Sequence, residues 1–418
     1  MSLECKKYCS PRWTGEIADC SLPVTLDTYN NCSFKCAYCF SQFQRSLGLC
    51  GNGYLQMRVS AIDVEKVKRI FLLQEESQFS EYIKDKRPIQ WGGLSDQFDN
   101  NERKYGKTLE LMRFFNELNY PISFSTKSAW VFHDERYLEL FRNQKGNWNV
   151  KFSIITNDAK KASIVEQGVE SPQNRLRAME IASGVGTLTT LRLRPFIIGL
   201  SSIGYEELIT DAHNCGASAL STEFLCIEQR SNTKENVRKN FDKISSVIGF
   251  DILEYYKKNS PGSGYLRLNR AVKSEYVKNM KELCEKLHMR FYVSDAHFKE
   301  LCNNSCCCGL PEEWKYSRGN FSYALEIAKK KGEVRFKDIE QDMYFLNFNY
   351  RRADGFNTGS AENRAKYYYL TMKEYLKYLW NNPKGKNSPM NAFAGVLIPT
   401  GIDEDGNVVY AFNQKVSL

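Results

Sequence analysis

A regular alternation of short apolar segments and amphipathic segments runs from about residue 23 to residue 228. Period-two or continuous apolar patterns predict strands, and apolar residues at helical spacing predict the helices between them. Strands that are each followed by a helix pair in parallel through right-handed crossovers, so we expect a parallel partial TIM barrel of six β/α repeats. The predicted strands are 23–29, 89–91, 122–126, 150–155, 191–199 and 218–227, and the predicted helices are 62–74, 107–118, 134–142, 172–182 and 205–214.

The rest of the chain divides into three further parts. An irregular segment with cysteines covers 1–22, and a polar insertion covers about 229–270 of a barrel that spans 23–300. The cysteine cluster and an extra α+β module occupy 301–418. The end of the barrel is predicted to contain a helix at 271–288 and a strand at 290–293. The C-terminal module is predicted to contain a helix at 366–380 and a terminal hairpin whose turn is 404–407.

The cysteines and the net charge limit the classes of function. No stretch of the 418 residues approaches the roughly 18 apolar residues of a membrane span, and no signal-peptide core follows Met1–Lys7, so we expect a cytoplasmic protein without a membrane partner. The chain has 14 cysteines, and outside an oxidising compartment such clusters indicate metal or redox chemistry rather than disulfides. The net charge of +9 permits an anionic partner but does not require one.

Three cysteines stand together directly after the first predicted strand. Cys32, Cys36 and Cys39 have the spacing C-x3-C-x2-C. Three thiolates on one short loop can bind three irons of a [4Fe–4S] cluster, which leaves the fourth iron without a protein ligand. A structural zinc site is the alternative, but zinc prefers a closed set of four ligands and no fourth ligand is nearby in the sequence.

This loop resembles the signature of the radical S-adenosylmethionine (SAM) superfamily in its cysteine spacing, its position after a first strand and its aromatic residues. The resemblance implies that the open iron chelates the amino and carboxylate groups of SAM, and that an electron from the cluster cleaves SAM to a 5′-deoxyadenosyl radical. It also implies that Tyr38 and Phe40 lie near the adenine. The expected cofactors are a [4Fe–4S] cluster and SAM, with a reducing partner such as flavodoxin or ferredoxin.

A glycine-rich segment, Trp91–Asp96, ends the second predicted strand. Glycine lets backbone carbonyls approach a ligand closely. By the resemblance, Gly92 and Gly93 lie along the amino group of SAM, and Asp96 takes the place of the acidic residue that often ends this motif. A simple turn at the end of the strand is the alternative.

Later motifs resemble the spore photoproduct lyase-like branch of the superfamily. They are Gly93–Phe98 with Glu102, Ser125–Ser128, Ser153, Glu166 with Ser171–Arg175, and Arg192 with Arg194-Pro195. The resemblance implies that Lys127, Ser153 and Arg194 contact the ribose or the carboxylate of SAM, and a guanidinium suits a carboxylate on chemical grounds. The alternatives are that Lys127 lies on the surface and that Arg194 forms a structural ion pair.

The hydrogen-donor cysteine of spore photoproduct lyase has no assigned counterpart in this sequence. Cys215 and Cys226 are candidates by position alone, and a buried cysteine is more often part of the core. The resemblance therefore implies a branch of the superfamily and not the repair of thymine dimers.

A second group of four cysteines lies within residues 302–308. We expect Cys302, Cys306 and Cys308 to bind an auxiliary iron–sulfur cluster, because adjacent Cys307 would point away. Zinc, and a thiol pair used for redox chemistry or hydrogen-atom donation, are the alternatives. Cys5, Cys9 and Cys20 could supply missing ligands if the N-terminal segment folds back, and His297 could assist zinc.

Asp295 and His297, at the end of the 290–293 strand, are candidates for proton transfer or substrate contact. A helix cap at Asp295 and a surface position for His297 are the alternatives.

The sequence as a whole predicts a radical SAM enzyme that abstracts hydrogen from a substrate held at the mouth of the barrel. The alternative is a non-catalytic iron–sulfur or zinc protein that binds nucleic acid, which would not cleave SAM and would bind with strong salt dependence. The net charge favours a nucleic acid substrate, whereas the extra cysteines favour a peptide or sulfur chemistry. The sequence leaves nucleic acid, peptide and small metabolite open.

Overall fold

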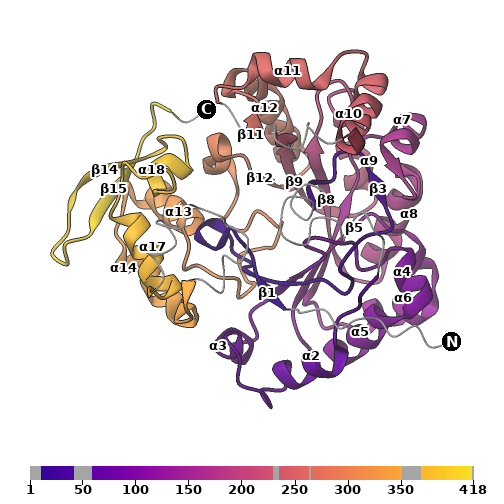
Figure 1. The fold of residues 1–418 in the computed structure, drawn as a ribbon, viewed down its shortest axis with the longest axis horizontal. Coiled ribbons are helices and arrows are strands. Elements are labelled where there is room, and N and C mark those ends of the chain that lie inside the picture. The colour runs from indigo at the N-terminus through magenta and orange to yellow at the C-terminus, as the bar shows by residue number, and fades with distance from the viewer. Residues whose placement is uncertain (1–10, 42–58, 229–234, 263–264, 351–368, 417–418) are drawn as a thin grey trace. The chain divides into compact units, whose positions relative to one another are not determined.

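The computed structural model describes residues 11–41, 59–228, 235–262, 265–350 and 369–416. The chain forms two compact units (Figure 1). The first comprises 26–64 and 91–291, and the second comprises 11–25, 65–90 and 292–418. The domain boundaries at residues 22 and 300 stay predictions. Among the described helices, none combines the length and the apolar character needed to cross a membrane.

The first unit is built on a mostly parallel sheet. The strand order is β1-β2-β4-β5-β6-β8-β9-β12, and the division between the units passes through β2, β4 and β12. β5, β6, β8 and β9 pair in parallel, while β1 pairs antiparallel with β2 within the second unit. The strands are β1 (Arg12–Trp13), β2 (Val24–Leu26), β4 (Ile89–Trp91), β5 (Ile122–Thr126), β6 (Trp148–Ser153), β8 (Leu188–Phe196), β9 (Ala217–Phe224) and β12 (Arg290–Val293).

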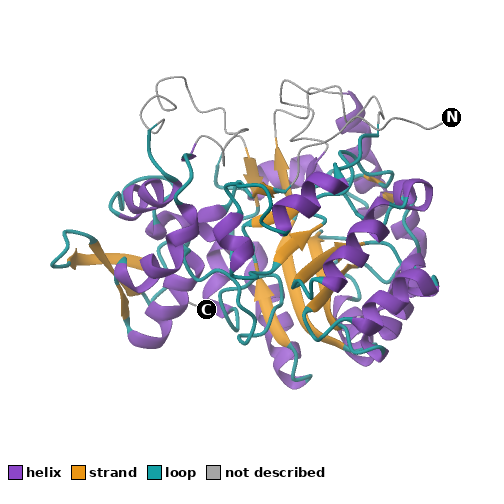
Figure 2. Cartoon of the chain, turned by 90° about the horizontal axis from the view of Figure 1, so that it is seen from below, coloured by secondary structure: helices purple, strands orange, loops and turns teal. Residues whose placement is uncertain are grey.

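Helices follow these strands and lie along the outer side of the sheet (Figure 2). Asp99, Asp134, Asp158 and Ser171 cap four of them through backbone N–H groups, as such residues do at helix N-termini. The helices and small strands of the first unit are α4 (Asn100–Tyr105), α5 (Lys107–Glu117), α6 (Glu135–Asn143), α7 (Ala159–Val165), α8 (Pro172–Gly184), α9 (Tyr205–Asn214), α10 (Glu235–Ile248), α11 (Ile252–Asn259), α12 (Arg270–Lys286), a 3-10 turn at Trp130–His133, β3 (Lys35–Cys36), β7 (Glu166–Gln167), β10 (Cys226–Glu228) and β11 (Tyr265–Arg267).

The two faces of the sheet differ in chemistry. On the outer face, Trp148 of β6 packs on Phe124 of β5 and Phe141 of α6, with ring centroids 5.3 and 5.5 Å apart. Because successive side chains of a strand point to opposite faces, the intervening residues share the inner face. These are polar: Ser123, Ser125, Asn149, Lys151, Ser153, Thr190 and Arg192. The strands thus present a polar wall toward the interior of the barrel.

The second unit carries the C-terminal module. Its antiparallel sheet has the order β13-β15-β14, and Trp380 packs against Tyr410 with ring centroids 5.0 Å apart. The unit contains α2 (Val64–Phe71), whose first residue lies in the first unit, α3 (Ser80–Lys84), α13 (Phe321–Lys331), α14 (Lys337–Glu340), α17 (Met372–Trp380), α18 (Pro389–Ala392), 3-10 turns at Ile17–Asp19, Ala296–Leu301 and Gln341–Leu346, and the strands β13 (Glu333–Val334), β14 (Leu397–Ile402) and β15 (Val408–Phe412).

Most predicted elements are present, with altered bounds. The predicted strand 23–29 ends at Leu26, because Asp27 turns its carboxylate to accept hydrogen bonds from the backbone of Leu94 and Ser95, at 2.7 and 3.2 Å. The predicted strand 218–227 is divided at Leu225, whose N–H donates to the carbonyl of Phe196. The terminal hairpin is confirmed, and part of the predicted helix 366–380 lies outside the described residues.

Candidate functional site

The first cysteine group lies on a loop that the chain holds at two places. On one side, Cys36 of β3 pairs with Glu166 of β7, and the N–H of Ala37 donates to the carbonyl of Val165 at 2.8 Å. On the other side, the N–H of Ser33 donates to Asp99, the N-cap of α4, at 2.5 Å. The loop is therefore fixed to α4 and to the end of α7 by backbone contacts of its own.

The three sulfurs lie close enough to affect one another. Burial raises the pKa of Cys36 to about 12, with Glu166 and Cys39 adding to the rise and Lys127 opposing it. Burial also raises the pKa of Cys32, to which Asp99, Asp96 and Cys36 contribute. These thiols must lose their protons to bind a metal. Within the described part of the chain, no three cysteine, histidine or acidic side chains are placed to hold a single ion, whereas a [4Fe–4S] cluster takes one cysteine at each of three irons.

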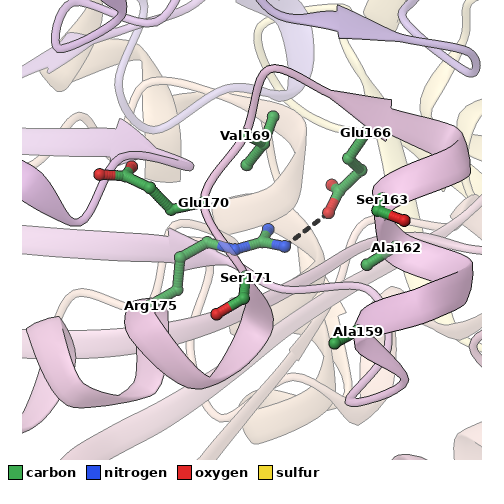
Figure 3. A pocket seen from close by; sticks show the side chains of 8 residues that line it. All are labelled: Ala159, Ala162, Ser163, Glu166, Val169, Glu170, Ser171 and Arg175. Carbon is green, nitrogen blue, oxygen red and sulfur yellow. Dashed lines mark hydrogen bonds and ion pairs between the residues drawn. The ribbon is translucent and has the colours of Figure 1, made fainter.

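A buried network joins this loop to the barrel. Tyr38, which is 6% exposed, donates its hydroxyl to Glu166. Glu166 also accepts from Arg175 of α8 at 2.6 Å (Figure 3). Arg175 donates to the carbonyl of Ser153 at 2.5 Å. Both charged side chains of this ion pair are 1% exposed. They border a small cavity of about 110 Å³. The network fixes the aromatic residue of the cysteine loop against the fourth β/α repeat.

Acidic residues of the segment that follows the glycine motif support the same loop. Burial raises the pKa of Asp99 to about 7, with Asp96 adding to the rise and hydrogen bonds from Ser33 opposing it. Glu102 of α4 is buried and accepts hydrogen bonds from the hydroxyls of Tyr29 and Tyr137, each at 2.6 Å. It also accepts from the N–H groups of residues 108 and 109. Glu102 therefore has a structural role at the first turn of α5.

The glycine motif packs closely against neighbouring polar groups, some of which have no hydrogen-bond partner. Gly92 has φ +91°, and a Cβ placed on it would lie 2.3 Å from Oε1 of Gln97 and 2.6 Å from the carbonyl oxygen of Ser125. Among the described residues, the amide of Gln97, the hydroxyl of Ser125 and Nδ2 of Asn31 are buried without a hydrogen-bond partner. Buried polar groups are normally paired, so this cradle suits a polar ligand. These residues and the three thiols therefore fit SAM and an iron–sulfur cluster.

Alanine at Gly92 tests how tightly this cradle is built. We expect Gly92→Ala to lower the free energy of unfolding by about 2–4 kcal/mol, because it combines an unfavourable φ with overlap of a backbone oxygen. Denaturant unfolding measures the change. Gly146→Ala is the matched control, since Gly146 has φ +75° and nothing within 4 Å of its Cβ position. Equal losses for the two variants would mean that the space beside Gly92 is not restricted.

The structure gives Asp96 several partners within the chain. Its carboxylate accepts from the N–H groups of Lys127 and Phe98, at 2.6 and 3.0 Å, and from the hydroxyl of Thr126 at 2.9 Å. Burial raises the pKa of Asp96, which these hydrogen bonds oppose. Asp96 therefore holds the end of β5 beside the glycine motif, and its contact with SAM stays a prediction.

The other predicted SAM ligands lie around the same end of the sheet. The ammonium of Lys127 lies 5.7 Å from the ring centroid of Tyr38, a cation–π contact that directs it toward the cysteine loop. Ser153, the last residue of β6, is buried, and its carbonyl is bound by Arg175. Arg194 forms an ion pair with Glu223 of β9, so its role as a carboxylate ligand stays a prediction. Phe40 is 43% exposed.

The remaining candidates fall at separate places. Cys215 ends α9, and the thiol of Cys226 lies 3.6 Å from the carbonyl oxygen of Phe224. Asp295 precedes the 3-10 turn at 296–301 without capping it through its side chain. The roles suggested for Cys215, Cys226, Asp295 and His297 stay predictions.

In the second unit, the segment Asp19–Ser21 packs against the second cysteine group. The hydroxyl of Ser21 donates to the carbonyl of Ser305 at 3.0 Å, and the half-buried Asp19 forms an ion pair with the buried Lys299. Burial raises the pKa of Cys20, and Cys308 and Cys307 add to the rise. Cys20 therefore lies beside the 302–308 group, whereas Cys5 and Cys9 are outside the described residues.

The members of that group have different surroundings. The sulfur of Cys302 lies 3.2 Å from the nitrogen and 3.3 Å from the oxygen of Val293. Burial raises its pKa to about 12, and Cys307 adds to the rise while Lys299 opposes it. Cys306 is fully buried. Burial raises the pKa of Tyr316, and the neighbouring Cys306 adds to the rise. Cys20, by contrast, lies near Cys307 and Cys308.

Comparison with known proteins supports the fold. No family model and no curated protein matches the chain. Among solved structures, spore photoproduct lyase complexed with dinucleoside spore photoproduct, and a single-site mutant of that lyase, each match with 18% identity. Each match covers 69% of this chain and 80% of the other chain, with a TM-score of 0.50. The likeness to the spore photoproduct lyase fold is therefore confirmed, as is a mostly parallel partial barrel with an added C-terminal module.

Proposed function

We propose that this chain is a radical SAM enzyme. The observation that carries the proposal is the position of Cys32, Cys36 and Cys39. They lie on one anchored loop in the unit that contains the glycine cradle, within a fold like that of spore photoproduct lyase. The unpartnered amide of Gln97 and the hydroxyl of Ser125 give this cradle polar groups for a ligand.

In the proposed mechanism, Cys32, Cys36 and Cys39 hold a [4Fe–4S] cluster, and this group supplies the electron for reductive cleavage of SAM. Gly92 and Gly93 let the backbone approach the amino group of SAM, and Lys127 offers a cation to its carboxylate. Tyr38 of the cysteine loop donates its hydroxyl to Glu166, and this hydrogen bond fixes the orientation of its ring. The polar inner wall of the barrel binds and orients the substrate from which hydrogen is abstracted.

For the substrate, we favour a nucleic acid or nucleotide over a peptide. The net charge of +9 suits a polyanion, and one solved structure of this fold is complexed with a dinucleoside. We further propose a cytoplasmic location and reduction by a flavodoxin or ferredoxin. A non-catalytic iron–sulfur or zinc protein that binds nucleic acid is the second candidate, because the cysteines and the charge fit it as well.

Anaerobic reconstitution tests the proposal. The purified chain is supplied with iron and sulfide, its metal content is counted, and SAM and dithionite are added. We expect 5′-deoxyadenosine to form, because an open iron binds and reduces SAM. A protein that takes up only zinc, or that holds iron but does not cleave SAM, contradicts the proposal and favours the non-catalytic candidate.

We also propose that the second cysteine group binds an auxiliary iron–sulfur cluster. The sequence favours Cys302, Cys306 and Cys308 as ligands, and the position of Cys20 beside Cys307 and Cys308 supports a contribution from Cys20. This centre would lie in the second unit. Of its four thiols, those of Cys306 and Cys308 are buried, and the cation of Lys299 opposes the rise in the pKa of Cys302.

Iron counting tests whether the second cysteine group binds a cluster and whether Cys20 and Cys306 are among its ligands. We expect about eight irons per chain, and a fall toward about four in Cys20→Ala, because each cluster holds four. Cys306→Ala has the same effect only if the set favoured by the sequence is right. Cys284→Ala is the control, since Cys284 is buried in α12 of the first unit. About four irons in the unaltered chain would exclude the auxiliary cluster.

A further inference from the structure

Lys151 is a buried cation on the inner face of the barrel sheet. It lies in β6 between Val150 and Phe152, which point to the outer face, and it is 2% exposed. Among the described residues, no hydrogen bond, ion pair or ring contact of its side chain is found. Charged side chains are almost never fully buried unless paired, so the position needs an explanation.

The neighbours of Lys151 are also polar. In the register of the sheet, Lys151 is flanked by Ser125 of β5 and Thr190 of β8. The hydroxyl of Ser125 is buried and has no partner among the described residues, and the same is true of the amide of Gln97. Gln97 and Ser125 meet at Gly92, since a Cβ on Gly92 would touch both. An ammonium, a hydroxyl and an amide, all able to donate, thus face the interior in one region.

A buried ammonium without a carboxylate costs several kcal/mol of desolvation unless a counter-charge is supplied. The described side chains supply none at Lys151. A bound anion would satisfy the ammonium and the hydroxyl together, because phosphate and carboxylate oxygens accept several hydrogen bonds at once. The free chain would then bear the cost of the buried charge, and the ligand would remove it.

We propose that Lys151, with Ser125 and Gln97, forms a subsite for an anionic group of the substrate, a phosphate or a carboxylate. This inference deepens the proposed function, since it names the charge of the substrate that the barrel accepts. Lys151 is distinct from the contact expected between SAM and Lys127, because it lies within β6 rather than after the end of a strand. Ser125 and Gln97 also belong to the glycine cradle and would be shared between the two ligands.

Thermal unfolding of the reconstituted full chain tests the subsite. Inorganic phosphate, citrate and SAM are titrated separately, and the midpoint of unfolding is followed. We expect phosphate or citrate to stabilise the unaltered chain. In Lys151→Met we expect the apparent dissociation constant for that anion to rise at least about tenfold. Without the anion, this variant should unfold at the same or a higher temperature, because a buried unpaired charge has been removed.

The controls separate this idea from the proposed function. Lys160→Met, at an exposed lysine of α7, should keep the full response to the anion. Lys151→Gln serves if the methionine variant does not fold. The subsite is refuted if the unaltered chain does not respond to either anion, if both lysine positions behave alike, or if Lys151→Met weakens only SAM. Formation of 5′-deoxyadenosine without substrate depends on none of these outcomes.

Discussion

Replacement of Cys32, Cys36 and Cys39 together by alanine is expected to reduce formation of 5′-deoxyadenosine at least about a thousandfold, which is about 4 kcal/mol in activation free energy. The reason is that the three thiolates are the expected ligands of the cluster that reduces SAM. The variant should also hold about four fewer irons per chain than the unaltered protein. Chromatography of the nucleoside and colorimetric iron counting measure the two changes.

Two features make this experiment decisive. The loop is held by Ser33 and Ala37 through backbone hydrogen bonds, which alanine at the cysteine positions preserves, so the fold should survive. The control is Cys215→Ala, at the end of α9, which should retain its iron. If the triple variant still forms 5′-deoxyadenosine at the original rate, the proposed ligand set is wrong.

Replacement of Arg175 by alanine is expected to have the second large effect, a loss of about 3–5 kcal/mol in the free energy of unfolding. Arg175 and Glu166 are each 1% exposed, so the change leaves a buried carboxylate without its counter-charge and the carbonyl of Ser153 without its donor. Iron uptake should fall as well, because Glu166 holds Tyr38 of the cysteine loop. Denaturant unfolding and iron counting measure both effects.

The same helix provides the matched control. Arg177 and Glu180 form an ion pair on α8 whose side chains are 68% and 55% exposed. An exposed pair contributes about 0–1 kcal/mol, so Arg177→Ala should change stability by no more than this. Comparable losses in the two variants would show that the buried pair does not tie the cysteine loop to the barrel.

The parts of the fold that depend on local patterns were predictable. The strands at 89–91 and 122–126 have the predicted bounds, and the helix at 172 begins at the proline that suited its first turn. The spacing of the first three cysteines is equally local. Contacts between distant residues were not predictable, because no local pattern specifies them. The hydrogen bond from Tyr38 to Glu166 joins residues 128 apart, and that from Ser33 to Asp99 joins residues 66 apart.

The sequence indicated Ser125, Ser153 and Arg192 of the polar inner wall but not Lys151, for a physical reason. A strand with both faces covered is expected to be apolar, and β6 is buried throughout, so Lys151 was not recognised as a site. Its alternation of aromatic and polar residues gave the only signal. The sequence offered Cys20 as a ligand of the second cysteine group if the N-terminal segment folds back, but no local pattern specified the packing of residues 19–21 on residues 299–305 that brings it beside Cys307 and Cys308.

The anchoring of the cysteine loop by Asp99 and by β7 has a consequence for how the enzyme withstands oxygen. Since backbone contacts of the chain itself keep the loop in place, loss of the proposed cluster should leave the loop folded. The cysteine loop should then accept a new cluster while the chain stays folded. Loss of the proposed cluster in air should then be reversible, because iron and sulfide can restore it without refolding of the chain.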